Sequence, residues 1–242
     1  MSDRDVGVVH KLVVFDIDGT LLDNLAAEDE CFVQALRDGL GLNAVSADWE
    51  TYQHVSDHGI VIETYRHEFG TAPLPDAVTD TIGRFVALLA AAYHAQPISQ
   101  IRGAAELLAS LPSHGWEVAM ATGAWLRAAQ FKLTAAGLRD DAIPLATSED
   151  GPARTDIVKT AVARAERHYE ATFDRIVSVG DGVWDVDAAR ALALPFVGVG
   201  TGARAERLRT AGAASVLPDL SSGVAVLAML ESATIPSAPP GG

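Results

Sequence analysis

The residues best suited to chemistry are four aspartates that follow two apolar segments. Asp16 and Asp18 lie in the run DIDGT at residues 16–20, directly after an apolar stretch. Asp181 and Asp185 lie in the run GDGVWD at residues 180–185, after a second apolar stretch, with a spacing of about one helical turn. Carboxylates held close together repel one another, and a divalent cation relieves that repulsion. The pattern therefore predicts a metal-assisted site.

These aspartates need strands to position them, and the sequence contains six β-branched or apolar runs of strand length. Most of the runs are continuously apolar, which is typical of a parallel sheet covered on both faces. They span residues 12–17, 117–121, 142–146, 175–179, 196–199 and 214–217. Helical patterns at 103–114, 124–136, 155–169 and 185–194 alternate with the later runs. This order predicts an α/β fold with a doubly wound, Rossmann-like parallel sheet.

In a parallel sheet, the carboxyl ends of the strands meet at one edge, where ligands bind. Asp16 lies at the carboxyl end of one predicted strand, and Asp181 and the pair Thr122-Gly123 follow two others. A polar turn is the simplest interpretation of the DGT run alone, with its glycine allowing a tight turn. The convergence of four carboxylates, a hydroxyl and a backbone amide instead favours a site that binds a metal ion and an anion.

A helical insertion interrupts the alternation, and no strand candidate lies between the first strand and Gly103. Helical patterns cover residues 25–40, 49–69 and 76–93, and Gly70 is placed to end the second of them. We expect a core domain from residues 1–23 and 98–235, with a helical cap from 24–97. The hinges would lie near Asn24 and Pro97. The Pro- and Gly-rich residues 236–242 are expected to be a disordered tail.

The composition limits the partners of this chain. Its 242 residues carry a formal net charge of −14, which argues against binding to nucleic acid or to anionic membranes. The single cysteine, Cys31, excludes an intrachain disulfide, and we expect it to be a buried small hydrophobe. No apolar stretch reaches the roughly 18 residues of a membrane span, and the N-terminus lacks a signal-peptide pattern. We expect a cytoplasmic protein that is a monomer or at most a weak homodimer.

The motifs resemble those of the haloacid dehalogenase superfamily. The run DIDGTL at residues 16–21 resembles its first motif, Thr122 its second, and residues 180–185 its fourth. A helical insertion between the first two motifs is similar to the cap of the phosphoglycolate phosphatase and β-phosphoglucomutase branch. The resemblance covers most of the chain, and the first motif is highly specific.

This resemblance implies a role for each motif residue. Asp16 would be the nucleophile that forms an aspartyl-phosphate, and Asp18 the general acid and base. Thr122 and the Gly123 amide would bind the oxygens of the transferred phosphoryl group. Mg²⁺ would be the cofactor, held by the groups that the family uses. These are the Asp16 carboxylate, the Asp18 main-chain carbonyl and Asp181, with Asp185 bound directly or through water.

The third motif departs from the family pattern, which usually has a lysine before the strand of the fourth motif. The segment reads GPARTDI at residues 151–157, and alignment on its last two residues places Pro152 at the usual lysine position. Arg154 and Lys159 are the nearby cations. We favour Arg154, because a residue at a helix entry can reach the strand edge and a guanidinium pairs well with carboxylate and phosphate. The alternatives are that Lys159 supplies the third-motif cation, or that both residues are only surface cations.

Signals within and beside the cap are weaker. His54, Asp57 and His58 form a polar cluster that is either a loop reading the leaving group or an exposed helix end. Trp125 either lines the cavity or is buried at the start of a core helix, and Trp184 is expected near the mouth of the site. The lysines are Lys11, Lys132 and Lys159, so the insertion has none and Schiff-base chemistry there is disfavoured.

The sequence favours a phosphatase that acts on a small phosphorylated metabolite, because a helical cap excludes bulky substrates. A phosphomutase of the β-phosphoglucomutase type would use the same aspartates and would depend on a bisphosphate activator. A non-catalytic binding protein that retains the fold is the third hypothesis, and the altered third motif is its support.

Overall fold

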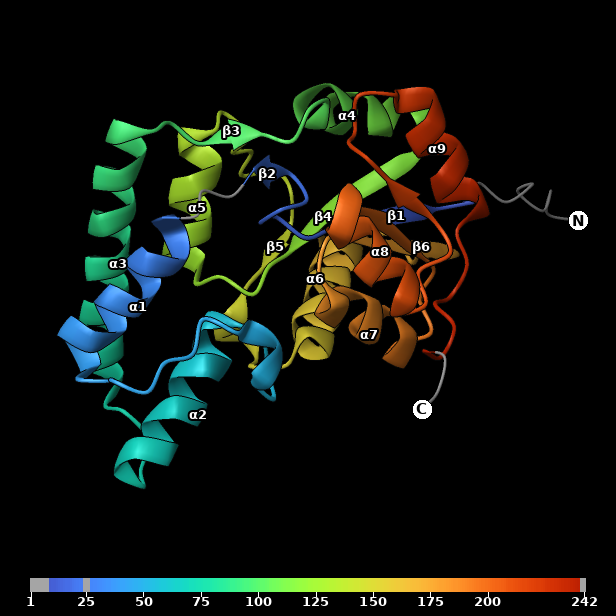
Figure 1. The fold of residues 1–242 in the computed structure, drawn as a ribbon. Coiled ribbons are helices and arrows are strands. Elements are labelled where there is room, and N and C mark those ends of the chain that lie inside the picture. Colours follow the sequence, from blue (N-terminus) through green and yellow to red (C-terminus); the bar gives the residue numbers. More distant parts are fainter. Residues whose placement is uncertain (1–8, 24–26, 240–242) are drawn as a thin grey trace, which may run out of the picture.

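The computed structural model describes residues 9–23 and 27–239, and its centre is the predicted parallel sheet (Figure 1). The sheet has the strand order β5-β4-β1-β6-β7-β8, and every pair in it is parallel. The strands are β1 (Lys11–Phe15), β4 (Trp116–Ala121), β5 (Leu145–Ala146), β6 (Arg175–Gly180), β7 (Phe196–Val199) and β8 (Val216–Leu217). The predicted α/β class is confirmed, and β1 and β6 lie at the centre of the sheet.

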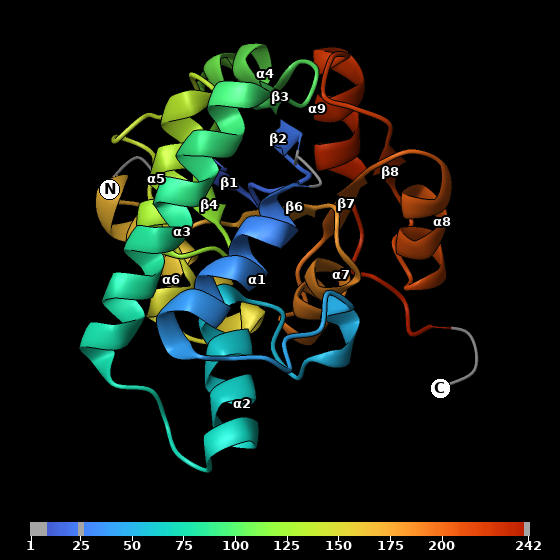
Figure 2. The same cartoon turned by 60° about the vertical axis from the view of Figure 1, so that its left-hand side comes forward.

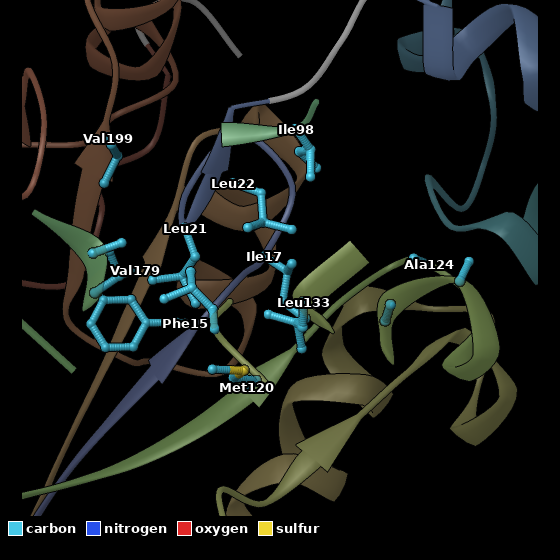
Figure 3. Close-up of a cluster of buried hydrophobic side chains, with 14 of the residues drawn as sticks. Phe15, Ile17, Leu21, Leu22, Ile98, Met120, Ala124, Leu133, Val179 and Val199 are labelled. Atoms are coloured by element: carbon cyan, nitrogen blue, oxygen red, sulfur yellow. The ribbon is translucent and has the colours of Figure 1, made fainter. Parts of the chain in front are cut away.

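Strand β1 is apolar on both sides because helices cover both faces of the sheet. Leu12 and Val14 belong to a buried cluster with residues of α6 (Arg154–His168). Val13 and Phe15 point to the opposite face, into the main core cluster. Figure 3 shows Phe15 within that second cluster, with Met120 and Val179 from the neighbouring strands. The alternation of side chains along a strand therefore divides one apolar run between two cores.

The remaining core helices begin near their predicted positions. They are α4 (Ala104–Ser110), α5 (Leu126–Ala135) and α7 (Val183–Ala191). The short 3₁₀ turn η2 (Leu111–His114) follows α4, and η3 (Ser148–Asp150) precedes α6. Two further helices, α8 (Gly202–Thr210) and α9 (Gly223–Ser232), had no predicted counterpart. Their burial explains the omission, because α8 buries only Ala205 and Leu208 and α9 only Val226 and Leu230. Such sparse burial gives little helical periodicity to detect.

The insertion is helical, as expected, and consists of α1 (Ala27–Leu40), η1 (Trp49–Thr51), α2 (Asp57–Phe69) and α3 (Pro75–Ala95). Figures 1 and 2 both show α1 and α3 packed side by side, and Figure 1 shows them away from the sheet. The helix expected over residues 49–69 is interrupted, and α2 begins after Ser56, whose hydroxyl accepts a hydrogen bond from the Gly59 amide at 3.1 Å. Gly70 ends α2 with a left-handed φ of 72°, as predicted.

Two short strands correct the prediction that this region contains none. β2 (Leu22–Asp23) and β3 (Ser99–Gln100) form an antiparallel pair where the chain leaves and rejoins the core. Two-residue strands are too short to show an alternating pattern in the sequence. The predicted hinge at Asn24 lies outside the described residues.

Two smaller expectations also differ from the structure. Cys31 is half-buried rather than buried, at the edge of the main core cluster. In the predicted tail, Ser237 is held by its amide to the Gly212 carbonyl at 3.1 Å and by Arg190, which donates to the Ser237 carbonyl at 2.9 Å. Among the described helices, none is both long and apolar enough to cross a membrane.

Candidate active site

Two strand tips and the first turn of a helix bring the predicted aspartates together. Asp16 follows β1, and its amide donates to the Val179 carbonyl of β6 at 2.9 Å. Asp181 follows β6, and Asp185 lies in the first turn of α7. Oxygens of these three aspartates all lie within 4.8 Å of one another. The structure therefore brings together carboxylates from opposite parts of the sequence, near residue 16 and near residue 185.

Burial raises the pKa of every carboxyl in this cluster, and repulsion from Asp185 adds to the effect on the other two. For Asp16, burial raises the pKa well above its ordinary value, and repulsion from Asp185 adds to the effect. Burial and then Asp185 raise the pKa of Asp181 to about 7. Burial also raises the pKa of Asp185, although Arg154 and an amide hydrogen bond from Gly182 oppose it. A cluster of this kind stores unfavourable charge that a cation would relieve.

Glycine is required at position 19 by both conformation and space. Gly19 has a φ of +80°, in the left-handed region that other residues rarely adopt. A Cβ at this position would lie 2.1 Å from Oδ2 of Asp181. Because residue 19 has no side chain, the Asp181 carboxylate can occupy this space beside Asp16.

Arg154 is the third-motif cation that reaches this cluster. Its Nη1 donates to Oδ1 of Asp16 at 2.9 Å and lies 3.7 Å from Oδ1 of Asp185. Burial lowers the pKa of the guanidinium, but Asp185 and Asp16 more than offset this, so the pKa is raised. The alternative, Lys159, has a side chain that is 64% exposed and pairs with Asp156 on the surface of α6. Geometry therefore favours Arg154.

Thr122 and Gly123 occupy the end of β4, between the cluster and the cap. The buried Thr122 hydroxyl accepts a hydrogen bond from the Ala124 amide at 3.1 Å, and the Thr122 amide donates to Ala146 at 3.0 Å. A Cβ on Gly123 would lie 3.0 Å from the Arg154 guanidinium. The two residues thus present a hydroxyl and a closely approachable backbone next to Arg154.

Two cations at the site were not foreseen. Lys132 of α5 forms an ion pair with Asp18, and Arg204 of α8 lies 3.2 Å from Oδ2 of Asp181. A signal for Lys132 exists in the sequence, because it shares a helical face with Ala128, Ala129 and Leu133, all of which are buried. A lysine on a buried helix face requires an anionic partner. Arg204 offers no such signal, since its helix was not predicted.

The loop that precedes α2 covers the site. The Ser56 hydroxyl donates to the Pro152 carbonyl at 2.7 Å, and the Asp57 amide donates to the Gly123 carbonyl at 2.8 Å. The Asp57 carboxylate accepts from the Trp125 amide at 2.9 Å, and Nε of Arg154 donates to the Val55 carbonyl at 3.2 Å. The cap loop is therefore tied to the second and third motifs.

A cavity of about 140 Å³ lies between this loop and the strand tips. Its lining combines aromatic and charged side chains: Asp18, Glu28, Asp29, Phe32, Trp49, Val55, Ser56, Asp57, Ile60, Phe85, Gly123, Ala124, Lys132, Arg154 and Trp184. Of the residues in the predicted polar cluster, Asp57 lines this cavity, whereas His54 and His58 are not among its lining residues. Trp184 lies at the site as expected, and Trp125 is fully buried against Phe32 and Phe85.

Comparison with known proteins identifies the family of this chain. The model of haloacid dehalogenase-like hydrolases matches residues 10–192, a segment that contains Asp16, Thr122, Arg154, Asp181 and Asp185. The protein belongs to this hydrolase family. No curated protein has a matching sequence.

Solved structures show that this haloacid dehalogenase-like hydrolase has the fold of other family members. A hydrolase from Pseudomonas syringae shares 22% identity over 90% of this chain and 98% of its own, with a TM-score of 0.64. CbbY from Rhodobacter sphaeroides, in complex with phosphate, shares 22% identity over 89% and 96%, with a TM-score of 0.64. A predicted phosphoglycolate phosphatase from Haemophilus somnus shares 18% identity over 90% and 98%, with a TM-score of 0.61.

Proposed function

We propose that this hydrolase is a Mg²⁺-dependent phosphatase of small phosphorylated metabolites, with Asp16 as the nucleophile. The observation that carries the proposal is the cluster of Asp16, Asp181 and Asp185 oxygens within 4.8 Å, next to a cavity that Asp18 lines. Phosphoryl transfer needs this combination, because a carboxylate approaches an anionic ester only where the neighbouring charge is neutralised. Membership of the family supports the same reaction class.

The residues present suit a magnesium ion. Three carboxylates form a hard oxygen donor set, and Gly19 keeps the space beside Asp181 free of a side chain. The carboxylates of Asp16, Asp181 and Asp185, with the Asp18 carbonyl, would hold the ion. When bound, Mg²⁺ would neutralise phosphate charge and help to orient the ester.

The side chains then divide the chemistry between them. A carboxylate oxygen of Asp16 forms a bond to phosphorus as the ester P–O bond breaks, and the leaving oxygen takes a proton from Asp18. Asp18 next removes a proton from water, and the resulting hydroxide attacks phosphorus and releases Asp16 and phosphate. We expect Arg154, which contacts Asp16, to bind the phosphoryl oxygens, while Thr122 and the Gly123 amide bind them from the end of β4.

The cap limits the substrate to a small molecule. We propose that residues 24–97 form a cap domain on a core of residues 1–23 and 98–235. The cap loop is hydrogen-bonded to the core at Gly123, Pro152 and Trp125, and the cavity beside it has a volume of about 140 Å³. A phosphorylated side chain on a folded protein domain would not reach Asp16 past this cover, whereas a small metabolite admitted by opening of the cap would.

Phosphate release from phenyl phosphate tests the proposal. We expect hydrolysis by the full-length protein with Mg²⁺, loss of hydrolysis in excess EDTA, and no measurable turnover in Asp16→Asn. The matched control is Asp187→Asn, which changes an exposed aspartate of α7 that pairs with Arg190 on the protein surface. Absence of Mg²⁺-dependent hydrolysis of phenyl phosphate and of a panel of phosphorylated metabolites would refute a phosphatase and favour a binding protein.

A phosphomutase would share the same aspartates, so a second measurement separates the two enzymes. Turnover of a sugar monophosphate without net phosphate release, and dependent on catalytic amounts of a sugar bisphosphate, would identify a mutase. Net phosphate release with no bisphosphate requirement is the result expected for a phosphatase.

A further inference from the structure

Lys132 is a buried cation that the family motifs do not include. It lies on the core helix α5, and its side chain is only 5% exposed. Its ammonium group forms ion pairs with Asp18 and, at 3.5 Å, with Oε2 of Glu28. Burial lowers the pKa of Lys132, but Asp18 and Glu28 more than offset this, so the pKa is raised and the group is charged. A charge buried this deeply persists because its partners compensate for lost hydration.

The two buried cations of the site serve different aspartates. Arg154 pairs with Asp16 and Asp185, on the side where phosphorus is attacked. Lys132 pairs with Asp18, the residue that would handle the proton of the leaving group. Lys132 therefore lies beside the residue that would protonate the leaving group.

Glu28 connects this pair to the cap. It is a buried residue in the first turn of α1, the first cap helix, whereas Lys132 and Asp18 belong to the core. Lys132 is thus held from two directions, by a cap carboxylate and by the carboxylate of the DIDGT run. The contact to Glu28 makes the position of the ammonium group depend on how the cap is seated.

We propose that Lys132 is a positioning residue, which, anchored by Glu28 of the cap, holds the Asp18 carboxylate in orientation for proton transfer to the leaving group and from the attacking water. The proposal rests on the proposed function. An aspartate at the wall of a cavity can rotate about two side-chain bonds, and the Asp18 side chain is 20% exposed here. The ion pair with Lys132 engages Oδ1 of Asp18, a residue that lines the cavity, and so restricts this rotation. Orientation of an acid or base contributes to catalysis because proton transfer requires hydrogen-bond distance.

Leaving-group dependence distinguishes positioning from other roles. Phenol, with a pKa of about 10, leaves as a strong base that needs a proton, whereas 2,4-dinitrophenol leaves readily as an anion. For Lys132→Met we expect kcat on phenyl phosphate to fall by about 30-fold and kcat on 2,4-dinitrophenyl phosphate by less than about threefold. General acid catalysis as a whole contributes about 10²–10⁴-fold, so a partial loss is consistent with disturbed orientation.

Two further variants complete the experiment. Lys159→Met removes an exposed lysine from α6 and should leave kcat on both esters unchanged. Glu28→Gln removes the cap anchor while keeping the size of the side chain, and it should lower kcat on phenyl phosphate selectively, by a smaller factor than Lys132→Met. Circular dichroism establishes which variants are folded, and if Lys132→Met is unfolded, Glu28→Gln decides the question.

Two results would overturn the proposal. An equal loss of kcat on both esters would indicate a general structural role, and a rise in KM with kcat unchanged would indicate that Lys132 binds the substrate. Failure of the proposed function is distinguishable from both, because the unaltered protein would then hydrolyse neither ester.

Discussion

Nη1 of Arg154 lies 2.9 Å from Oδ1 of Asp16, although 138 residues separate them in the sequence. The same guanidinium donates through Nε to the Val55 carbonyl of the cap loop at 3.2 Å. One side chain thus contacts both the proposed nucleophile and the cover of the site. A planar guanidinium can make these contacts simultaneously, whereas an ammonium group is a single point of charge.

Arg154→Lys should therefore impair catalysis although it keeps the charge. We expect kcat/KM for phenyl phosphate to fall by roughly tenfold to 100-fold, a loss of about 1.4–2.7 kcal/mol in transition-state binding. Steady-state kinetics with Mg²⁺ provides the measurement. Arg167→Lys, an exposed position near the end of the same helix, is the control and should behave as the unaltered protein. Equal activity of both variants would contradict the role assigned to the guanidinium.

Gly19→Ala should reduce Mg²⁺ binding because its Cβ would overlap the Asp181 carboxylate, 2.1 Å away. Isothermal titration with Mg²⁺ should show at least about tenfold weaker affinity, equivalent to about 1.4 kcal/mol. Gly137→Ala is a matched control, since Gly137 has a similar φ of +71° but no atom within 4 Å of the added Cβ. Both variants incur left-handed backbone strain of about 1–2 kcal/mol, so unequal metal affinity isolates the effect of the overlap.

Magnesium should stabilise the protein more at pH 8 than at pH 5. Burial and neighbouring carboxylates raise the folded-state pKa of Asp181 to about 7, above its ordinary value of 3.8. Between these values the folded protein binds more protons than the unfolded chain, so without metal the free energy of unfolding falls as pH rises. Magnesium binds the ionised carboxylates, and at 100 times its Kd it adds about 2.7 kcal/mol.

Thermal unfolding with and without Mg²⁺, at both pH values, measures this effect. The increase in Tm should be larger at pH 8, and Asp181→Asn should diminish it. An increase of the same size at pH 5 and pH 8 would show that the carboxylate cluster is not the binding site.

Asp57→Asn should raise stability in a pH-dependent way. Burial raises the pKa of Asp57 to about 7, although Lys132 and the Trp125 amide oppose the shift. The folded state retains the Asp57 proton up to about pH 7, so this residue lowers the free energy of unfolding as pH rises from about 4 to 7. Asparagine can still accept the hydrogen bond from the Trp125 amide but carries no charge.

We therefore expect the Tm of Asp57→Asn to exceed that of the unaltered protein by roughly 2–4 °C at pH 8, the effect of about 1 kcal/mol in a protein of this size. The difference should shrink or vanish at pH 5. Asp76→Asn, in the first turn of α3 on the cap surface, is the control. A Tm difference independent of pH would mean that Asp57 is ionised in the folded protein across this range.

The strands show why much of the fold could be predicted. β1 and β6 are continuous apolar runs because both of their faces are covered, and that burial is encoded residue by residue. The short strands β2 and β3 and the sparsely buried helix α8 were missed because neither a two-residue strand nor a helix with two buried residues produces a periodic pattern. The interruption at residues 52–56 was missed because tertiary hydrogen bonds hold that loop.

By itself, the sequence determined the parallel sheet and the edge at which Asp16, Thr122 and Asp181 lie, because parallel strands that carry polar residues at their carboxyl ends must place them together. The tertiary structure alone decided which cations serve these aspartates. Arg154 on Asp16, Lys132 between Asp18 and Glu28, and Arg204 beside Asp181 all depend on how separate helices pack. Packing angles and distances between elements distant in the chain arise from the whole core, and no local pattern of residues contains them.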